Sequence, residues 1–264
     1  MEYFIIFIQP QKIMNMPLPT VNARKLSFKN NEYVCWIDIM GTRNIMSESV
    51  SKAANSIFKL HSCVMDCIDE DGDATFYPLM DGVFITSPNY GKIFLIIDKL
   101  FSRFADIFLT TPNHEHLFVV KGSLSYGPIM HGCDITDEMC EMMVCNDTYK
   151  QFILLGLPMI QAYNVEATAP PFGIFIHESA RKYKGLQGRY YGWKYRDDEF
   201  NLLPNQEEVK QKLMNKVIEY FNWCEQYCNY LEMDENKIAK YKKLAKEYFN
   251  SCLLYTSPSP RDTR

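Results

Sequence analysis

The sequence predicts an α+β fold in which helices pack on an antiparallel sheet. Three observations lead to this prediction: short runs rich in β-branched and aromatic residues are typical of strands, two longer segments carry apolar residues at spacings of three and four that indicate helices, and turn residues separate them. A chain of 264 residues with 47% hydrophobic content also has enough apolar material for a packed core.

The first predicted strand covers residues 33–40, YVCWIDIM, and ends at Gly41. The run is apolar apart from Asp38, which suits a buried strand. A helix is expected from Ser47, because apolar residues then recur every three or four positions until the acidic stretch DEDGD at 69–73.

The next stretch, ATFYPLMDGVFITSP at 74–88, predicts two strands joined by a turn at Asp81 and Gly82. A second amphipathic helix fits residues 92–109, and the turn residues TTPNHEH end it. A further strand is expected in LFVVKGSLSYGP, residues 117–128. The resulting order of strand, helix, strand, strand, helix, strand is a ferredoxin-like βαββαβ arrangement.

The rest of the chain is predicted to be more helical. Residues 138–168 are expected to be mostly helical with a break at Gly156 and Pro158, and two strands are expected at 172–177 and 188–195. From residue 207 to 249 the composition shifts to Lys, Glu, Tyr and Asn with helical apolar spacing, which predicts a C-terminal helical hairpin interrupted near Asp234.

These patterns divide the chain into four expected segments. They are an N-terminal extension over 1–30, the main α+β domain over 31–200, the C-terminal helical segment over 201–251, and a tail over 252–264. The tail, CLLYTSPSPRDTR, resembles translated sequencing-adapter sequence and is expected to be non-native.

Charge and cysteine usage exclude several classes of protein. Lys plus Arg is 28 and Asp plus Glu is 32, a net charge of −4, which argues against a nucleic-acid-binding protein with a basic face. Nine cysteines without a CxxC pair or a secretion signal indicate reduced thiols and a cytoplasmic protein. The apolar YFIIFI at 3–8 is too short to span a membrane.

Two aspartates are the strongest candidates for chemistry. Asp38 ends the first strand and Asp81 lies in the hairpin, and a βαββ connection places that strand beside the hairpin, so both carboxylates can approach one point. Two such carboxylates repel each other unless one is protonated or a cation lies between them. Hard oxygen ligands select Mg²⁺ or Mn²⁺, which makes the pair a candidate two-metal site for phosphoryl chemistry. The alternative for Asp81 is ordinary turn chemistry before a glycine.

Four blocks in order carry a resemblance to a known family. WIDIMGT (36–42), LMDGVFI (79–85), VKGSLSYGP (120–128) and LLGLPMIQAYNVEA (154–167) resemble successive blocks of the class III nucleotide cyclase catalytic domain. More narrowly, they resemble the bacterial antiphage pyrimidine cyclases of the Pycsar type. The resemblance covers about residues 33–177.

The resemblance implies a reaction and a set of ligands. Two divalent cations, Mg²⁺ or Mn²⁺, would be held by Asp38, Asp81 and the carbonyl oxygen of Ile39. The ribose 3′-hydroxyl of a nucleoside triphosphate would attack its own α-phosphate and release pyrophosphate. The resemblance further implies a homodimer with sites at the interface, and a cyclic product that is read by a separate effector.

Other residues are expected to bind the substrate. The backbone amides of Gly41, Thr42 and Arg43 lie at a strand-to-helix turn, where amides can bind phosphate oxygens. Arg43 is also the first candidate for the cation that stabilises charge on the reacting phosphate, with Lys121 as the second. Weaker candidates for that cation are Arg189, Lys194 and Arg196.

The chain departs from the family at the base-reading positions. Tyr77 stands where purine cyclases have a lysine, and Ile153 stands where they have an aspartate. Ile160 and Asn164 occupy the positions of the family's asparagine and arginine. Because a tyrosine can stack on or hydrogen-bond to a smaller base, we expect UTP or CTP as the substrate.

Two other hypotheses remain open. One is a catalytically silent relative that binds a nucleotide or a partner, which the missing arginine and asparagine suggest. The other is a different palm-like enzyme, such as one that joins two nucleotides. Residues 114–116, HEH, are read as part of a polar loop rather than as a metal pair. Five lysines are read as the solvated face of the last helix: Lys237, Lys240, Lys242, Lys243 and Lys246.

Overall fold

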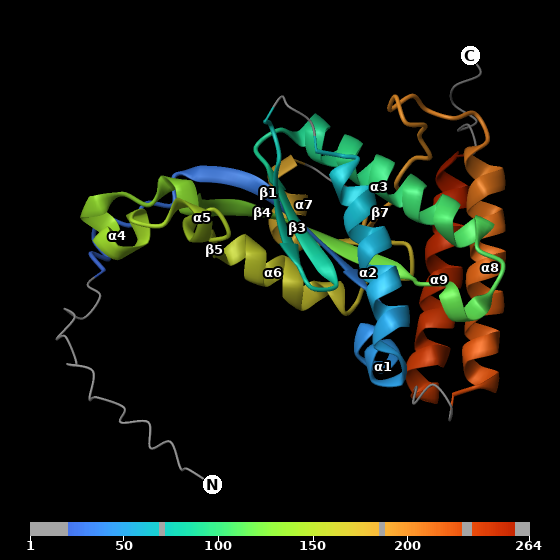
Figure 1. Cartoon of the computed structure of the whole chain (residues 1–264). Helices are drawn as coiled ribbons and strands as arrows, with labels where there is room; N and C mark the ends of the chain where they lie inside the picture. Colours follow the sequence, from blue (N-terminus) through green and yellow to red (C-terminus); the bar gives the residue numbers. More distant parts are fainter. Residues whose placement is uncertain (1–20, 69–71, 185–187, 229–233, 257–264) are drawn as a thin grey trace, which may run out of the picture. The chain divides into compact units, whose positions relative to one another are not determined.

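Strand β1, Asn30–Ile39, is the central strand of the site-bearing half of the sheet. It pairs antiparallel with β3, Gly82–Ser87, on one side and with β4, Val120–His131, on the other. β2, Thr75–Leu79, forms the predicted hairpin with β3. The order β2-β3-β1-β4, antiparallel throughout, confirms the predicted ferredoxin-like arrangement (Figure 1).

The computed structural model describes residues 21–68, 72–184, 188–228 and 234–256. The first twenty residues of the expected N-terminal extension and residues 257–264 of the expected tail lie outside this part of the chain. The chain divides into two compact units, one made of Met1–Ser27 with His131–Ile153 and the other of Phe28–Met130 with Leu154–Arg264.

The smaller unit contains short helical elements only, within its described residues. They are a 3₁₀ turn at Gly132–Asp134, α4 at Asp137–Val144 and α5 at Asp147–Lys150. The backbone amide of Asn22 donates a hydrogen bond to the carbonyl of Met139 at 2.9 Å, which ties the two segments of this unit together. Residues 131–153, which fall inside the predicted 31–200 segment, belong to this smaller unit, and the four-segment division stays a prediction.

The sheet continues beyond β4 through three short strands. β6, Ile174–Ile176, pairs parallel with β4. β7, Tyr190–Tyr191, then pairs antiparallel with β6. β5, Leu154–Gly156, also pairs with β4 but lies outside the strand order that leads to β7. The predicted strands at 172–177 and 188–195 are therefore shorter than expected. The backbone after β7 bonds to a helix instead of a strand, because the amide of Lys194 donates to Asp98 at 2.9 Å.

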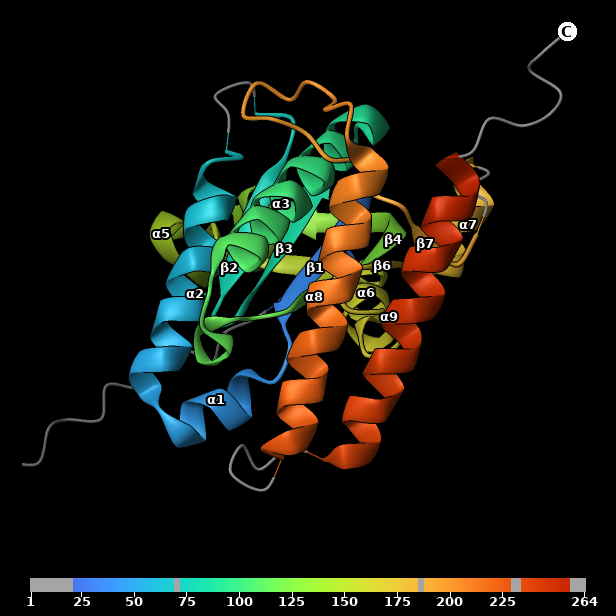
Figure 2. The same ribbon diagram turned by 90° about the vertical axis from the view of Figure 1, so that its right-hand side faces the viewer.

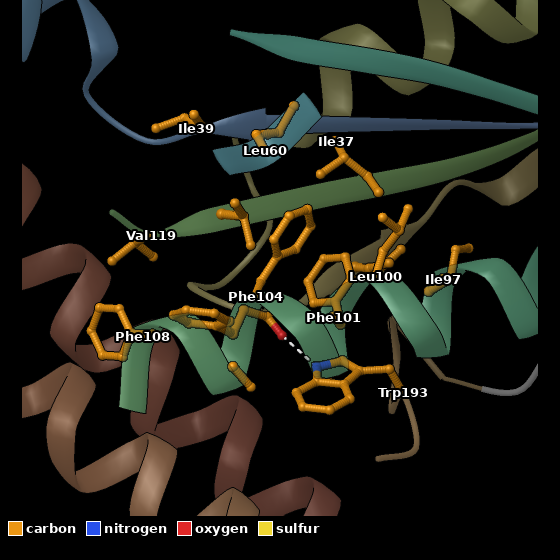
Figure 3. Close-up of a cluster of buried hydrophobic side chains, with 14 of the residues drawn as sticks. Ile37, Ile39, Leu60, Ile97, Leu100, Phe101, Phe104, Phe108, Val119 and Trp193 are labelled. Atoms are coloured by element: carbon orange, nitrogen blue, oxygen red, sulfur yellow. Dashed lines mark hydrogen bonds between the residues drawn. The ribbon is translucent and has the colours of Figure 1, made fainter. Parts of the chain in front are cut away.

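Helices α2, Val50–Met65, and α3, Tyr90–Thr110, cover one face of the sheet (Figures 1 and 2). The main hydrophobic core lies between them and the sheet, where Figure 3 shows Phe101 and Phe104 of α3 among the core side chains. Trp193 closes this core, and its indole N–H donates to the Phe172 carbonyl at 2.8 Å.

A second, smaller core lies on the opposite face under α6, Leu157–Glu166. Side chains alternate along a strand, so Tyr33, Cys35 and Ile37 of β1 belong to the main core while Val34 and Trp36 belong to the smaller one. Asp38 follows the same alternation as Trp36, which assigns its side chain to the α6 face.

The helix predicted from residue 47 to 68 corresponds to α2, and a short helix that was not predicted, α1, Thr42–Glu48, precedes it. α1 ends at Ser49, which has an extended backbone and caps α2 by accepting a hydrogen bond from the Lys52 amide. The predicted apolar stripe begins only at Val50, so it gave no indication of α1. The sheet-bearing unit also contains a 3₁₀ turn at His114–His116 and the short helix α7 at Glu178–Lys184.

The predicted C-terminal helical hairpin is confirmed. α8, Gln206–Gln226, and α9, Glu235–Thr256, lie side by side (Figures 1 and 2), and α8 also packs against α3. The Lys242 ammonium lies 2.8 Å from the Glu225 carboxylate between the two helices. None of the described helices combines the length and the apolar composition that crossing a bilayer would require.

Candidate functional site

The structure brings the two candidate aspartates to one end of the sheet. Asp38 is the partner of Gly82 in the β1–β3 ladder, so Asp81 lies one residue beyond that pair. The backbone amide of Ile39 donates to the carbonyl of Asp81 at 3.0 Å, which fixes the tip of the hairpin to the end of β1.

Gly82 is required for this approach. A Cβ atom at position 82 would lie 2.4 Å from the Trp36 ring and 2.7 Å from the Ile37 carbonyl oxygen. Both distances are far below van der Waals contact, so only glycine allows β1 and β3 to pair closely at this point.

Asp38 is in an unfavourable environment for a charged carboxylate. Burial raises its pKa to about 7, and the nearby carboxylates of Glu166 and Asp81 act in the same direction. Lys121 and the backbone N–H of Ile39 oppose this rise in pKa but do not cancel it. The site therefore has an excess of negative charge that a bound cation would relieve.

A buried ion pair lies next to Asp38. Lys121 of β4 is the cross-strand partner of Asp38, and its ammonium is 2.9 Å from the carboxylate of Glu166 at the end of α6. Both side chains are at least 90% buried. The Lys121 ammonium also lies 3.5 Å from the Tyr241 hydroxyl of α9. Sequence reasoning missed Glu166, because its contact with Lys121 depends on where the end of α6 packs and not on a local pattern.

The turn from β1 into α1 is built by two residues that were expected to bind phosphate. Gly41 has φ 78°, a left-handed conformation that favours glycine, and it precedes the first turn of α1. The buried Thr42 donates its hydroxyl to the carbonyl of Ile39 at 3.1 Å. A carbonyl oxygen has two lone pairs, so Ile39 retains one for a second partner.

A cavity of about 300 Å³ opens beside Asp38. One side consists of the strand ends and the β1–α1 turn, and the other side belongs to the C-terminal hairpin. The lining residues are Asp38, Met40, Gly41, Asn44, Val119 and Lys121 on the first side, and Tyr220, Phe221, Asp234, Lys237, Ile238 and Tyr241 on the second. Lys237, expected on a solvated face, thus lines the same cavity as Asp38.

Six of the expected site residues do not line this cavity: Ile39, Thr42, Arg43, Tyr77, Asp81 and Asn164. Arg43 is exposed on α1, and Asn164 is exposed on α6. Tyr77 is buried in the smaller core, where it is the ladder partner of Phe84. Of the weaker cation candidates, Arg196 is engaged elsewhere, since its Nε lies 2.8 Å from the carboxylate of Asp98.

The donor set fits a divalent ion only in part. The described residues contain no group of three or more His, Cys, Asp or Glu side chains that could hold a metal ion by themselves. Asp38, Asp81 and the Ile39 carbonyl would have to be joined by oxygens of a substrate or water. Mg²⁺ commonly binds in this way, through one or two carboxylates and substrate phosphates. The excess negative charge around Asp38 agrees with such a site.

His114 makes two contacts with helix α8. The His114 ring stacks on the Trp223 ring with a centroid distance of 5.7 Å and an interplanar angle of 17°. Its Nε2 lies 3.3 Å from the Glu219 carboxylate. These contacts attach the loop after α3 to α8 and agree with the reading of HEH as a loop feature.

Comparisons with known proteins give similarity of fold only. No family model matches the sequence, and no curated protein matches it. Among solved structures, the guanylyl cyclase domain of the RhoGC fusion protein from Blastocladiella emersonii is 14% identical, with a TM-score of 0.43 over 58% of this chain and 82% of that one.

Two adenylyl cyclases show similarity at the same level. A monomeric adenylate cyclase from Trypanosoma brucei is 12% identical, with a TM-score of 0.43 over 59% of this chain and 75% of that one. CyaB from P. aeruginosa is 13% identical, with a TM-score of 0.35 over 59% and 81% of the two chains. The structural neighbours are thus class III nucleotide cyclase domains.

Proposed function

We propose that this chain is a nucleotide cyclase that converts a pyrimidine nucleoside triphosphate, UTP or CTP, into its 3′,5′-cyclic monophosphate and pyrophosphate. The observation that carries the proposal is the placement of Asp38 and Asp81 at one end of the sheet, where burial and neighbouring carboxylates raise the pKa of Asp38 to about 7. Such a site favours a cation, and a cyclase substrate brings phosphate oxygens to complete the coordination.

The residues of the site would have distinct roles. Asp38, Asp81 and the Ile39 carbonyl would hold two divalent ions, which when bound supply charge neutralisation and activation of the 3′-hydroxyl. In the reaction the 3′-oxygen forms a bond to the α-phosphorus and loses its proton, and the bond to the β-phosphate oxygen breaks. The amides at Gly41 and Thr42 are proposed to bind phosphate oxygens. Lys121 is held close to Asp38 by Glu166.

The choice of a pyrimidine rests on the sequence departures and on the resemblance. Tyr77 and Ile153 replace the two residues that read adenine in purine cyclases. The resemblance to Pycsar-type cyclases also motivates the biological part of the proposal, a second messenger in antiphage defence that a separate effector reads. Arg43 and Asn164 remain proposed substrate contacts, and both are solvent-accessible.

An exposed apolar surface supports the proposed homodimer. Leu157, Ile160 and Tyr163 lie along α6 and are each more than half exposed, and the hairpin tip adds Met80 at 77% exposure. Contiguous exposed apolar residues commonly mark a protein–protein interface. A second copy of this chain is the partner that the resemblance implies, and light scattering of the intact protein measures it.

The decisive experiment is product identification. The purified protein is incubated with each of the four nucleoside triphosphates and Mn²⁺, and the products are identified by mass spectrometry. We expect cyclic UMP or cyclic CMP with equimolar pyrophosphate, and no such product from Asp81→Asn. A well-folded sample that forms no cyclic product from any triphosphate contradicts the proposal, and a product that joins two nucleotides favours the palm-like alternative.

A second candidate function is favoured by the position of three residues. The cavity beside Asp38 is not lined by Arg43, Asn164 or Tyr77. This is compatible with a catalytically silent cyclase-like protein that binds a nucleotide or a partner. Calorimetry separates the two functions, because nucleotide binding without pyrophosphate release favours the silent protein.

A further inference from the structure

The cavity beside Asp38 has a wall that the sheet does not provide. Tyr220 and Phe221 of α8 and Lys237 and Tyr241 of α9 form it. Figures 1 and 2 show α1, which follows the Asp38 strand, beside the ends of α8 and α9 that lead into their connection. A segment about 200 residues away along the sequence thus closes the candidate site.

The first turns of α9 are held in place by several contacts. The Asp234 carboxylate accepts hydrogen bonds from the amides of Asn236 at 2.8 Å and Lys237 at 3.3 Å, and so caps the helix. Ile238 is buried. The Tyr241 ring stacks on the Phe221 ring, with centroids 6.2 Å apart and an interplanar angle of 21°. These contacts position Lys237 and Tyr241 on a fixed helical turn, four residues apart and on one face.

The two lysines of the cavity differ in their charge balance. Lys121 is neutralised by Glu166 at 2.9 Å. No carboxylate within the described ranges lies at ion-pair distance from the Lys237 ammonium, which is solvent-accessible at the cavity wall. Lys237 is therefore available to neutralise an anion that enters the cavity.

We infer that the C-terminal hairpin binds the substrate of its own chain, with Lys237 contacting the phosphates of a nucleoside triphosphate and Tyr241 contacting its ribose or base. The identity of the ligand rests on the proposed function. A cavity of about 300 Å³ is at the lower end of the range for small-molecule sites. A lysine is well suited to this role, because its ammonium donates up to three hydrogen bonds to phosphate oxygens.

Calorimetric titration with UTP and with CTP, each in the presence of Mn²⁺, tests the inference on the full chain. We expect Lys237→Ala to raise the dissociation constant about tenfold or more, and Lys237→Arg to restore it to within about threefold. Lys243→Ala is the matched control, since it removes the same charge from an exposed site on the same helix and is expected to leave binding unchanged. Tyr241→Phe separates the hydroxyl contact from the ring contact.

The outcomes distinguish this inference from the proposed function. If Lys237→Ala binds the nucleotide as tightly as the wild type does, the inference is overturned even where cyclic product forms. If binding depends on Lys237 but no cyclic product forms, the binding site stands and the cyclase proposal fails. If the wild-type chain binds neither nucleotide, both are overturned.

Mixing two variants tests whether the contact is made within one chain. Asp38→Asn and Lys237→Ala each damage one side of the cavity. In an equimolar mixture of the two variants we expect no recovery of tight nucleotide sites, because each chain carries one defect in its own cavity. Recovery of tight sites would place Lys237 in the cavity of a second copy and would overturn the same-chain contact.

Discussion

Two aspartates in this protein, the buried Asp98 and the partly buried Asp38, show how a structural carboxylate differs from a candidate functional one. Burial raises the pKa of both. Asp98 accepts hydrogen bonds from the Tyr191 hydroxyl and the Lys194 amide, each at 2.9 Å, and from Arg196 at 2.8 Å. Asp38 has carboxylates among its neighbours instead, and they raise its pKa further.

The comparison teaches that burial alone does not identify a site. Both carboxylates have lost solvent to some degree, but the donors around Asp98 oppose the rise in its pKa, whereas the carboxylates near Asp38 add to the rise in its pKa. The donors of Asp98 attach the segment after β7 to α3, which is a structural task. Lys121 and the Ile39 amide oppose the raised pKa of Asp38 without cancelling the rise, so a bound cation would stabilise its charge. This difference leads to four predictions.

The largest effect is expected on turnover. Asp38→Asn removes a proposed metal ligand while it preserves the shape of the side chain, and we expect the rate of cyclic nucleotide formation to fall by about 1,000-fold or more. Product formation measured by mass spectrometry checks this. The surface variant Asp147→Asn, whose side chain is largely exposed, is the control and is expected to keep full activity. Activity of Asp38→Asn within tenfold of the wild type contradicts the functional assignment.

A large effect on stability is expected at the other aspartate. Asp98→Asn leaves the largely buried Arg196 without its partner charge, and we expect the free energy of unfolding to fall by about 3 kcal/mol. Turnover per folded molecule should stay within about twofold. Denaturation in urea measures the first quantity and an assay at low temperature measures the second. A loss of stability below about 1 kcal/mol would show that the two sites are less different than their contacts indicate.

The pH dependence of stability distinguishes the two sites further. The pKa of Asp38 is about 7 in the folded chain and about 4 in the unfolded chain, so the folded state holds this proton more tightly. The associated stability is fully present below pH 4 and is lost as the pH rises to about 7 and above.

In metal-free buffer we therefore expect Asp38→Asn to be more stable than the wild type at pH 8, by on the order of 2 kcal/mol after screening is allowed for. The advantage should disappear near pH 4. Urea denaturation at several pH values checks it. An equal stability difference at pH 4 and pH 8 would contradict the raised pKa.

The smallest effect is expected from metal binding. Mn²⁺ at ten times its dissociation constant should stabilise the folded chain by about 1.4 kcal/mol, which corresponds to a melting temperature about 3–5 °C higher. Asp38→Asn and Asp81→Asn should each remove this shift, whereas Asp147→Asn should retain it. Differential scanning calorimetry measures the shift. An undiminished shift in Asp38→Asn and Asp81→Asn would place the ion elsewhere.

The sequence predicts the frame of the site because local patterns determine it. The period-two pattern of the hairpin, the apolar run before Gly41 and the βαββ connection are sufficient to place Asp38 beside Asp81. Residue types and short-range spacing carry this information. The predicted roles of the two aspartates stay predictions until a metal or a substrate is bound.

Other parts of the site depend on packing between distant segments. Lys121 is paired because the end of α6 brings Glu166 to it, and Lys237 lines the cavity because α8 and α9 pack together. Neither arrangement can be recognised from the local sequence. In a helical pattern, for example, a fully exposed lysine and a lysine at a cavity wall occupy the same kind of position. The short strand β7 was overestimated for the same reason, because its continuation bonds to the side chains of α3.

The contact between Gly82 and Trp36 has a consequence for how this protein tolerates mutation over evolutionary time. The Trp36 ring of the smaller core occupies the space that a side chain at position 82 would need. The packing of the protein interior therefore determines where the hairpin tip lies. The side chain of the neighbouring Leu79 is exposed, so it can change without moving Asp81. Positions 36 and 82 must instead change together or not at all.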